Sequence, residues 1–237
     1  MISKEKIHIN NPLVDHTLTL KVQQFFLLFQ DIAGKNAELI GSGKEATTDK
    51  GWDWVVTRFV VNFLEPVNYG SDVELFTFPA GMKSGFIFYR NGGINSLDGK
   101  PLIRISSMWN IMDNKTRRLV LKPNLPYYGD DFGEEFELPE KIAKEENLKL
   151  CFSKTIRYSD CDINRHMNNT RYIDMVCDIN NSDFYSKYRI SRLEINFNSE
   201  VYDGEVVDVF VNEDKTYIEG RTKEKLSFVA RLAYTLR

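Results

Sequence analysis

One short segment of the chain concentrates side chains that can carry out hydrolysis. Its sequence, DCDINRHMNN, runs from Asp160 to Asn169 and brings carboxylate, amide and imidazole groups together. Hydrolysis needs a positioned water, a group that takes its proton and donors for the developing oxyanion, and these side chains supply such groups. Asp162, Asn164 and His166 alternate in sequence, so an extended backbone would project all three the same way. The segment is therefore a candidate catalytic centre.

The two asparagines at the end of the segment are placed to begin a helix. Asn168 or Asn169 can cap a helix predicted from about Asn168 to Ile179, because an Asn side chain accepts a hydrogen bond from the first turn. The positive end of that helix would then lie beside the candidate centre and could polarise a carbonyl group. Capping alone also explains the pair, and a single histidine in a turn is often structural. The residues by themselves leave both interpretations open.

Two other chemistries deserve comparison at this segment. The spacing Asp160-x-Asp162-x-Asn164 resembles the start of a calcium loop, but Arg165 stands where the glycine of the sharp turn belongs. Cys161 could act as a nucleophile, although nothing in the sequence marks out a base that would activate it. The chain contains no nucleophile elbow, Walker loop, dinucleotide fingerprint or zinc-protease motif. We therefore expect no metal and no cofactor.

Hydrophobic periodicity indicates the elements that must position this segment. Apolar residues spaced by three and four predict a helix from about Thr17 to Ile40. Strand patterns follow at 54–63, 72–78, 85–90 and 102–112, with turns predicted at 91–93 and 98–100. The same order returns with a strand at 152–158, the second helix at 168–179, and strands at 192–197, 206–212, 216–222 and 228–236. Each half holds one helix that can bury its apolar stripe against antiparallel strands, which predicts an α+β protein.

Between the two halves the regular pattern is lost. Residues 124–149 contain Pro126 and Pro139 together with acidic residues that include Asp130 and Asp131. This composition predicts an exposed linker, with a short helix near 141–146.

Composition excludes several classes of protein. The 237 residues carry a net charge of −3, which argues against a general nucleic-acid binder. The most apolar run, Phe25–Phe29, is far too short to cross a bilayer, so no membrane insertion is expected. Three irregularly spaced cysteines suit a reducing compartment, and the start of the chain lacks the apolar core of a secretory signal. A cytoplasmic protein is expected.

The polar segment also carries a resemblance to a known family. Its residues form the string Asp-x-Asn-x-His-x-Asn-Asn-x-x-Tyr, at Asp162, Asn164, His166, Asn168, Asn169 and Tyr172. This string resembles the signature of the acyl-acyl-carrier-protein thioesterases of bacteria and plant plastids, at the start of the second domain's helix. Residues 29–38 and 52–58 resemble the first helix and the following strand of that family. No plastid transit extension is visible, so the chain resembles the bacterial form.

The resemblance implies a tandem (double) hotdog fold, in which each unit is a long helix wrapped by an antiparallel sheet. It implies an N-terminal unit at 1–123 that binds the acyl chain, a linker at 124–149 and a C-terminal unit at 150–237 that carries the catalytic motif. The implied substrate is acyl carrier protein bearing a fatty acyl chain. The implied reaction is hydrolysis of the thioester, which releases free fatty acid and ends chain elongation without a cofactor.

The resemblance also implies a fourth catalytic residue after the second helix. Alignment places it at Glu200, with Glu194 as the nearby competitor. Glu200 would activate or position water with Asn164 and His166, and the helix N-terminus would stabilise the oxyanion. Asp162 would either orient this network or attack the thioester itself to give a transient anhydride. The sequence does not separate the two routes.

Substrate contacts are expected in both units. Phe25, Phe29, Met108 and Trp109 could line an apolar tunnel in the first unit, while a plain core is the alternative explanation of the same stripe. Asn168 and Asn169 are expected to contact the substrate near the thioester. The acidic carrier protein calls for a basic docking surface. Candidates for that surface are Lys115, Arg117, Arg118, Arg165 and Arg171.

Three rival functions stay open from the sequence. A hotdog thioesterase could act on acyl-coenzyme A, a hotdog dehydratase would release no free acid, and an acyl-binding protein would retain the fold without catalysis. Two hotdog units in one chain supply the pairing that single units obtain by dimerising. A monomer and a homodimer are therefore both compatible with the sequence.

Overall fold

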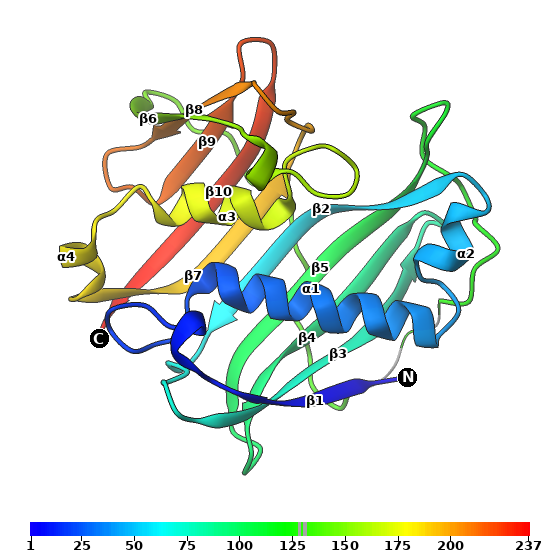
Figure 1. The fold of residues 1–237 in the computed structure, drawn as a ribbon, viewed down its shortest axis with the longest axis horizontal. Helices are drawn as coiled ribbons and strands as arrows, with labels where there is room; N and C mark the ends of the chain where they lie inside the picture. Colours follow the sequence, from blue (N-terminus) through cyan, green and yellow to red (C-terminus); the bar gives the residue numbers. More distant parts are fainter. Residues whose placement is uncertain (128, 130–131) are drawn as a thin grey trace.

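A computed structural model of the protein describes residues 1–127, 129 and 132–237, and these residues form a ten-stranded sheet (Figure 1). The strand order is β1-β3-β4-β5-β2-β7-β10-β9-β8-β6. The halves of the chain meet where β2 pairs antiparallel with β7, with Phe59 opposite Ile195. The strands of both halves therefore make one continuous sheet.

Each half runs from a strand through a helix to further strands. The first half contains β1 (Ser3–His8), the 3-10 helix η1 (Asn11–Leu13), α1 (Val22–Leu39), α2 (Lys44–Thr48), β2 (Trp52–Phe63), β3 (Asp72–Lys83), β4 (Ile87–Ser96) and β5 (Pro101–Asp113). The second half contains β6 (Lys149–Thr155), η2 (Tyr158–Asp160), α3 (Asn169–Cys177), α4 (Ser182–Tyr185), β7 (Tyr188–Phe197), β8 (Val206–Val211), β9 (Tyr217–Arg221) and β10 (Leu226–Leu236). The predicted α+β class and the repeated order of elements are confirmed.

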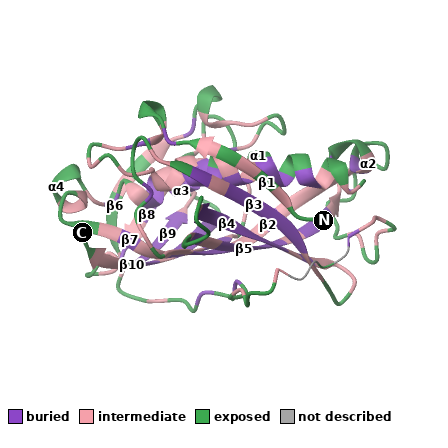
Figure 2. Cartoon of the chain, turned by 90° about the horizontal axis from the view of Figure 1, so that it is seen from below, coloured by how far each residue is buried: buried purple, intermediate pink, exposed green. Residues whose placement is uncertain are grey.

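The two main helices lie on the same face of the sheet (Figures 1 and 2). Helix α1 buries Phe25, Phe29 and Ile32 completely, and α3 buries Tyr172 and Val176. These side chains join one hydrophobic core with the inward-facing residues of the strands. Burial of this apolar surface is the main force that holds the helices on the sheet.

Helix α1 begins five residues later than the periodicity predicted, at Val22 instead of Thr17. The residues before it form a tight turn, in which the Asp15 side chain accepts the Thr17 N–H at 2.8 Å and Leu18 takes a φ of +61°. Strand β1 was not predicted at all. Its burial alternates along a charged sequence, SKEKIH, as is typical of a protected edge strand.

The turn predicted at residues 91–93 is wrong, because these residues lie inside β4. A Cβ added at Gly92 would lie 2.3 Å from the carbonyl oxygen of Phe76 and 2.8 Å from a ring carbon of Phe29. The glycine therefore allows the sheet to approach helix α1 closely. Such a close approach is a common reason for a glycine inside a strand. The turn predicted at 98–100 is confirmed between β4 and β5, with Gly99 at a φ of +90°.

The segment that joins the halves runs along the face of the sheet opposite the helices (Figure 2). The helix predicted near 141–146 is wrong, since these residues form no helix. Instead Asn196 of β7 holds the backbone there, accepting the Ile142 N–H at 2.9 Å and donating to the Glu140 carbonyl at 3.1 Å. Asp130 and Asp131, which contributed to the prediction of the linker, lie outside the described residues.

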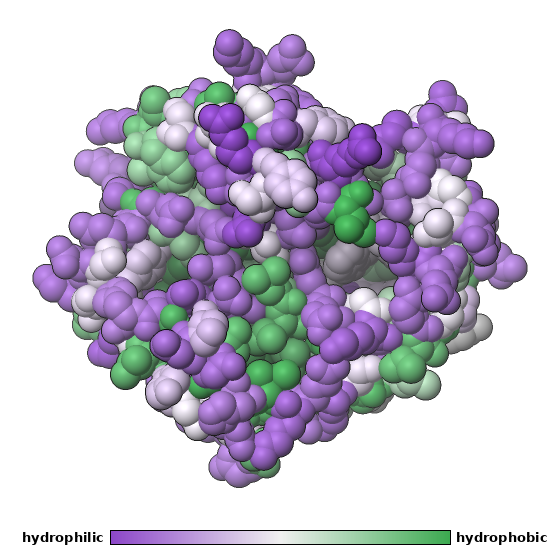
Figure 3. Space-filling model, viewed as in Figure 1, coloured by the Kyte–Doolittle hydropathy of each residue, from purple (hydrophilic) through white to green (hydrophobic). Residues whose placement is uncertain are grey.

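The face that carries α1 and α3 is mainly hydrophilic, with hydrophobic residues gathered near its centre (Figure 3).

In the part of the chain that the structure describes, every helix is too short or too polar to cross a membrane.

Candidate active site

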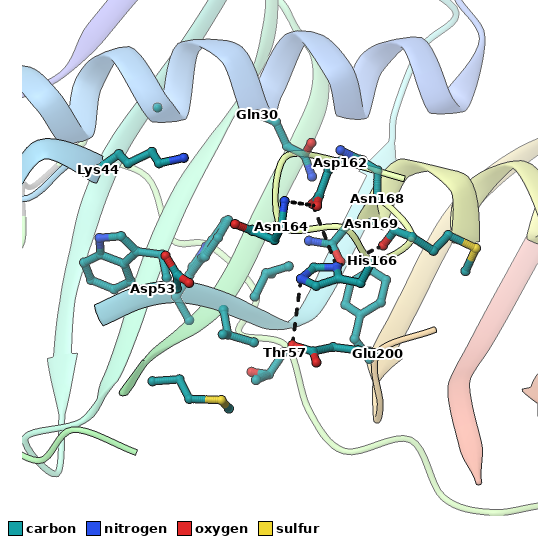
Figure 4. Close-up of a pocket in the computed structure, with 18 of the residues that line it drawn as sticks. Gln30, Lys44, Asp53, Thr57, Asp162, Asn164, His166, Asn168, Asn169 and Glu200 are labelled. Carbon is teal, nitrogen blue, oxygen red and sulfur yellow. Dashed lines mark hydrogen bonds and ion pairs between the residues drawn. The ribbon is translucent and has the colours of Figure 1, made fainter. Parts of the chain in front are cut away.

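The polar segment forms a tight turn directly before α3. The Asp162 N–H donates to the His166 carbonyl and the Arg165 N–H donates to the Asp162 carbonyl, both at 3.0 Å, and Arg165 takes a φ of +65°. The extended backbone expected from the alternating residues is therefore wrong. The turn still brings the three side chains together, because Asp162, Asn164 and His166 project toward one another from its bend (Figure 4).

The helix cap expected at the end of the segment is present. Asn168 is the N-cap of α3, and its Oδ1 accepts the Thr170 N–H at 2.9 Å. Asn169 is the first residue of the helix, where backbone N–H groups have no partner within the helix. The Met167 N–H donates to the Val201 carbonyl at 2.7 Å and so ties the loop to the segment that follows β7. The helix N-terminus thus lies beside the imidazole of His166 (Figure 4).

His166 lies between two carboxylates. Its Nδ1 is 3.9 Å from Oδ2 of Asp162, and its Nε2 is 3.8 Å from Oε1 of Glu200. Both distances are longer than a hydrogen bond, and such contacts often tighten when the substrate binds. The other oxygen of Asp162 accepts the Asn164 N–H at 2.8 Å, which directs Oδ2 toward the imidazole.

Glu200 is held by donors from both halves of the chain. It accepts hydrogen bonds from Arg117 Nη2 at 2.6 Å and from the Tyr202 hydroxyl at 2.7 Å. Burial opposes ionisation of Glu200, but these two donors and the charges of His166 and Arg117 outweigh it, so its pKa lies below the ordinary value. Glu200 is therefore a carboxylate at neutral pH. Arg117, which the sequence suggested for carrier docking, instead contacts Glu200, and Tyr202 was not anticipated.

The site opens into a cavity of about 870 Å³. The second half contributes six of the predicted site residues to its lining, namely Asp162, Asn164, His166, Asn168, Asn169 and Glu200. The first half contributes Gln30, Ala33, Gly34 and Ala37 of α1, Trp54 and Val56 of β2, Arg90 of β4 and Trp109 of β5. The cavity therefore extends from the His166 loop along α1, across β2 and β5, to β4.

The predicted acyl-binding side chains divide into two groups. Trp109 lines the cavity, whereas Phe25, Phe29 and Met108 are not among the described residues that line it. Phe25 and Phe29 have no exposed surface and pack in the core, as in the alternative explanation of their stripe. The wall on the α1 side comes instead from the small residues named above. Their spacing of three and four along the helix is the sequence signal that could have indicated this wall.

The other candidates that the sequence offered, Cys161, Asp160 and Glu194, have different surroundings. The Cys161 thiol has a raised pKa because of burial and the nearby carboxylates Asp203 and Asp160, so it is held as the unreactive thiol. Asp160 forms an ion pair with Lys154 at 3.0 Å. Glu194 forms an ion pair with Arg192. Among the described residues, no group of three or more His, Cys, Asp and Glu side chains is arranged to hold a metal ion.

A helix wrapped by antiparallel strands, present twice in one sheet, defines the tandem hotdog class of proteins. Two known domains match the chain. The acyl-ACP thioesterase N-terminal domain matches residues 2–123 and the acyl-ACP thioesterase C-terminal domain matches residues 143–232. The chain belongs to the acyl-ACP thioesterase family.

Named relatives come from plants. The chloroplastic palmitoyl-acyl carrier protein thioesterase of Gossypium hirsutum is 27% identical over 183 residues, which are 70% of this chain and 43% of that protein. The protein of the same name from Arabidopsis thaliana is 30% identical over 159 residues, 60% of this chain and 37% of that protein. The matches span less than half the length of these curated relatives.

Solved structures share the fold over nearly the whole chain. An acyl-ACP thioesterase from Bacteroides thetaiotaomicron superposes with a TM-score of 0.90 and 22% identity, covering 99% of this chain and 98% of that one. The 12:0-ACP thioesterase from Umbellularia californica superposes with a TM-score of 0.86 and 18% identity, covering 100% and 98%. The predicted double hotdog fold is confirmed.

Proposed function

We propose that the protein hydrolyses the thioester that links a fatty acyl chain to acyl carrier protein, releasing free fatty acid and ending elongation. The observation that carries this proposal is the position of His166, between Asp162 and Glu200 in the lining of a long cavity. Membership of the acyl-ACP thioesterase family supports the same reaction and the same carrier.

In the proposed mechanism, Glu200 and His166 activate a water molecule that attacks the thioester carbonyl. The proton of the water passes to His166. The N-terminus of α3, with Asn169 at its first position, stabilises the oxyanion of the tetrahedral intermediate, assisted by the side chain of Asn164. The intermediate then breaks its carbon–sulfur bond, and His166 returns the proton to the leaving thiolate of the carrier.

Asp162 has the role of orienting the imidazole. One of its oxygens accepts the Asn164 N–H and the other faces His166, so neither is directed at an incoming carbonyl. The covalent alternative, in which Asp162 attacks and forms an anhydride, would add the mass of the acyl group to the protein during turnover. Mass spectrometry of acid-quenched enzyme tests this, and an acyl adduct on Asp162 would overturn the orienting role.

In the proposed mechanism, the two units have different roles. The N-terminal unit at 1–123 receives the acyl chain and the C-terminal unit at 150–237 carries the reacting groups, with 124–149 as the connection between them. The cavity lining and the contact of Arg117 with Glu200 support a site that is complete within one chain, so a monomer would suffice. A cytoplasmic location, shared with the carrier protein, belongs to the same proposal.

The test is release of free fatty acid from matched acyl thioesters of acyl carrier protein and coenzyme A. We expect faster release from the carrier protein. Faster release from coenzyme A would indicate an acyl-CoA thioesterase, and binding without release would indicate an acyl-binding protein. Formation of an enoyl product without free acid would indicate a dehydratase. Each of these three outcomes contradicts the proposal.

A further inference from the structure

The cavity contains a buried cation that has no counter-ion among the residues that the structure describes. Arg90 of β4 lines the cavity and is only 4% exposed. Its Nη1 donates to the side-chain oxygen of Asn36 at 2.7 Å and to the hydroxyl of Thr77 at 3.3 Å, and both acceptors are neutral. No carboxylate among the described residues forms an ion pair with it. A buried charge of this kind is normally paired.

The guanidinium of Arg90 has more N–H donors than its hydrogen bonds to described side chains use. An arginine carries five N–H donors, yet both hydrogen bonds of Arg90 to described residues come from Nη1. The neighbouring Tyr127 donates its own proton to the Tyr89 carbonyl at 2.7 Å. Burial lowers the pKa of Arg90, and Tyr127 opposes this effect.

Arg90 on β4 and the strand that leads to Glu200, β7, are separated in the sheet by β5 and β2. Across the sheet, Arg90 pairs with Ser107, Ser107 with Phe59, and Phe59 with Ile195 of β7. Three strand spacings separate β4 from β7, which amounts to about 14 Å. Glu200 follows the end of β7, so an acyl chain held at Glu200 would extend across the sheet toward Arg90.

The lining between the two ends is suited to an acyl chain. Trp54, Val56 and Trp109 contribute apolar surface from the sheet, and Ala33 and Ala37 contribute it from α1. A plain methyl end that reached Arg90 would remove water from the guanidinium without replacing its hydrogen bonds. A carboxylate would replace them, because its two oxygens match the planar fork of an arginine and its charge neutralises the cation.

We propose that the cavity selects acyl chains that carry an oxygen acceptor at the end remote from the thioester, with a terminal carboxylate as the preferred group, and that Arg90 binds this group. The inference rests on the proposed thioesterase function and specifies its substrate class.

The test compares acyl carrier protein thioesters of equal chain length that end in a methyl, a hydroxyl or a carboxylate group. For the wild-type protein we expect kcat/KM to be about 10- to 100-fold higher for the carboxylate end than for the methyl end, as for a hydrogen bond to a charged group. The hydroxyl end should fall between the two. Arg90→Met should abolish the preference while hydrolysis of the methyl-ended chain continues.

Arg104→Met is the matched control. Arg104 is also a largely buried arginine of the same sheet, but it forms an ion pair with Glu134 at 2.8 Å and does not line the cavity among the described residues. Its loss should leave the ratio between the three substrates unchanged. If Arg90→Met does not fold, the ratio measured on the wild-type protein decides the question alone.

A wild-type preference for methyl-ended chains would overturn the inference. If Arg90→Met instead raised kcat/KM for longer methyl-ended chains, the role of Arg90 would be to limit chain length. Equal rates for all three ends would overturn it as well. These results leave the proposed function intact, because methyl-ended chains are still hydrolysed. Absence of hydrolysis for every chain and both carriers would instead reject the proposed function.

Discussion

The loops that precede α1 and α3 share a pattern of backbone hydrogen bonds but carry different side chains. In the first loop, the Asp15 N–H donates to Thr19 and the Leu18 N–H donates to Asp15, both at 3.0 Å, with Leu18 at a φ of +61°. The second loop repeats these features with the same two distances at Asp162, Arg165 and His166. The Leu20 N–H reaches the Val67 carbonyl at 2.8 Å, as the Met167 N–H reaches Val201 at 2.7 Å.

This correspondence relates each catalytic candidate to a position in the first unit. The pairs are Asp162 with Asp15, Asn164 with Thr17, His166 with Thr19, Asn168 with Lys21, and Glu200 with Pro66. The aspartate is the one member of the set found in both loops, and in both it accepts the N–H two residues later at 2.8 Å. The turn is therefore a property of the backbone and its aspartate, whereas the proposed chemistry depends on the other side chains.

The first loop also has a different neighbourhood. It borders a smaller cavity of about 400 Å³, and Arg237 projects there to donate to the Thr19 hydroxyl at 3.2 Å. The same turn therefore occurs in both units, and the proposed catalytic groups Asp162, Asn164 and His166 lie on the turn of the second unit. Each of the following predictions tests this distinction, in order of decreasing effect.

The largest effect is expected from removing the imidazole. His166→Ala should lower fatty acid release by about 10²- to 10⁴-fold, because it removes the proposed proton acceptor. Thr19→Ala, at the corresponding position of the first loop, should change the rate little. Rates measured on folded variants check the prediction, and equal losses in both would remove the distinction between the loops.

The second-largest effect is expected at Glu200, the fourth proposed catalytic residue. Glu200→Gln preserves shape but removes the charge beside His166, so release should fall by about 10²-fold. Glu194→Gln serves as the control, since Glu194 pairs with Arg192 and is not among the described residues that line the cavity. A larger loss in the control would transfer the catalytic role to Glu194.

The third effect is a change in pH dependence. The donors on Glu200 lower its pKa, so its ionised form persists below the ordinary range of a carboxyl group and is lost only as the pH falls through the lowered value. Arg117→Gln removes one of these donors, so the part of the acid limb of kcat/KM that follows protonation of Glu200 should move to higher pH, while activity at neutral pH is largely kept. Pro66 occupies the corresponding position in the first unit and provides no such titration. An unmoved acid limb would show that Glu200 does not determine it.

The smallest effect is one of stability. Asn168→Ala should lower the free energy of unfolding by about 1 kcal/mol, because it removes the side-chain cap of α3. Lys21→Ala should leave it nearly unchanged, since Lys21 occupies the corresponding position before α1 without a side-chain cap hydrogen bond. Urea denaturation of both variants measures the difference. Similar stabilities would show that the cap contributes little in this fold.

Much of the architecture was predictable because it depends on local patterns. The spacing of apolar residues indicated α1, α3 and nearly all the strands, and a cap at Asn168 or Asn169 followed from residue type. The string from Asp162 to Tyr172 indicated the candidate site because its residues are neighbours in the chain. The sequence also indicated a repeated unit, although the residues of the two halves differ.

Only the tertiary structure decided how these parts meet. Arg117 and Glu200 are 83 residues apart, and their contact depends on the pairing of β2 with β7, which no periodicity expresses. The cavity wall also depends on packing, because the spacing of small residues marks a stripe on α1 but does not show that this stripe borders a cavity. Local sequence determines which elements form and which groups they carry. Long-range register and packing determine which groups meet, because these contacts form only when the whole sheet is assembled.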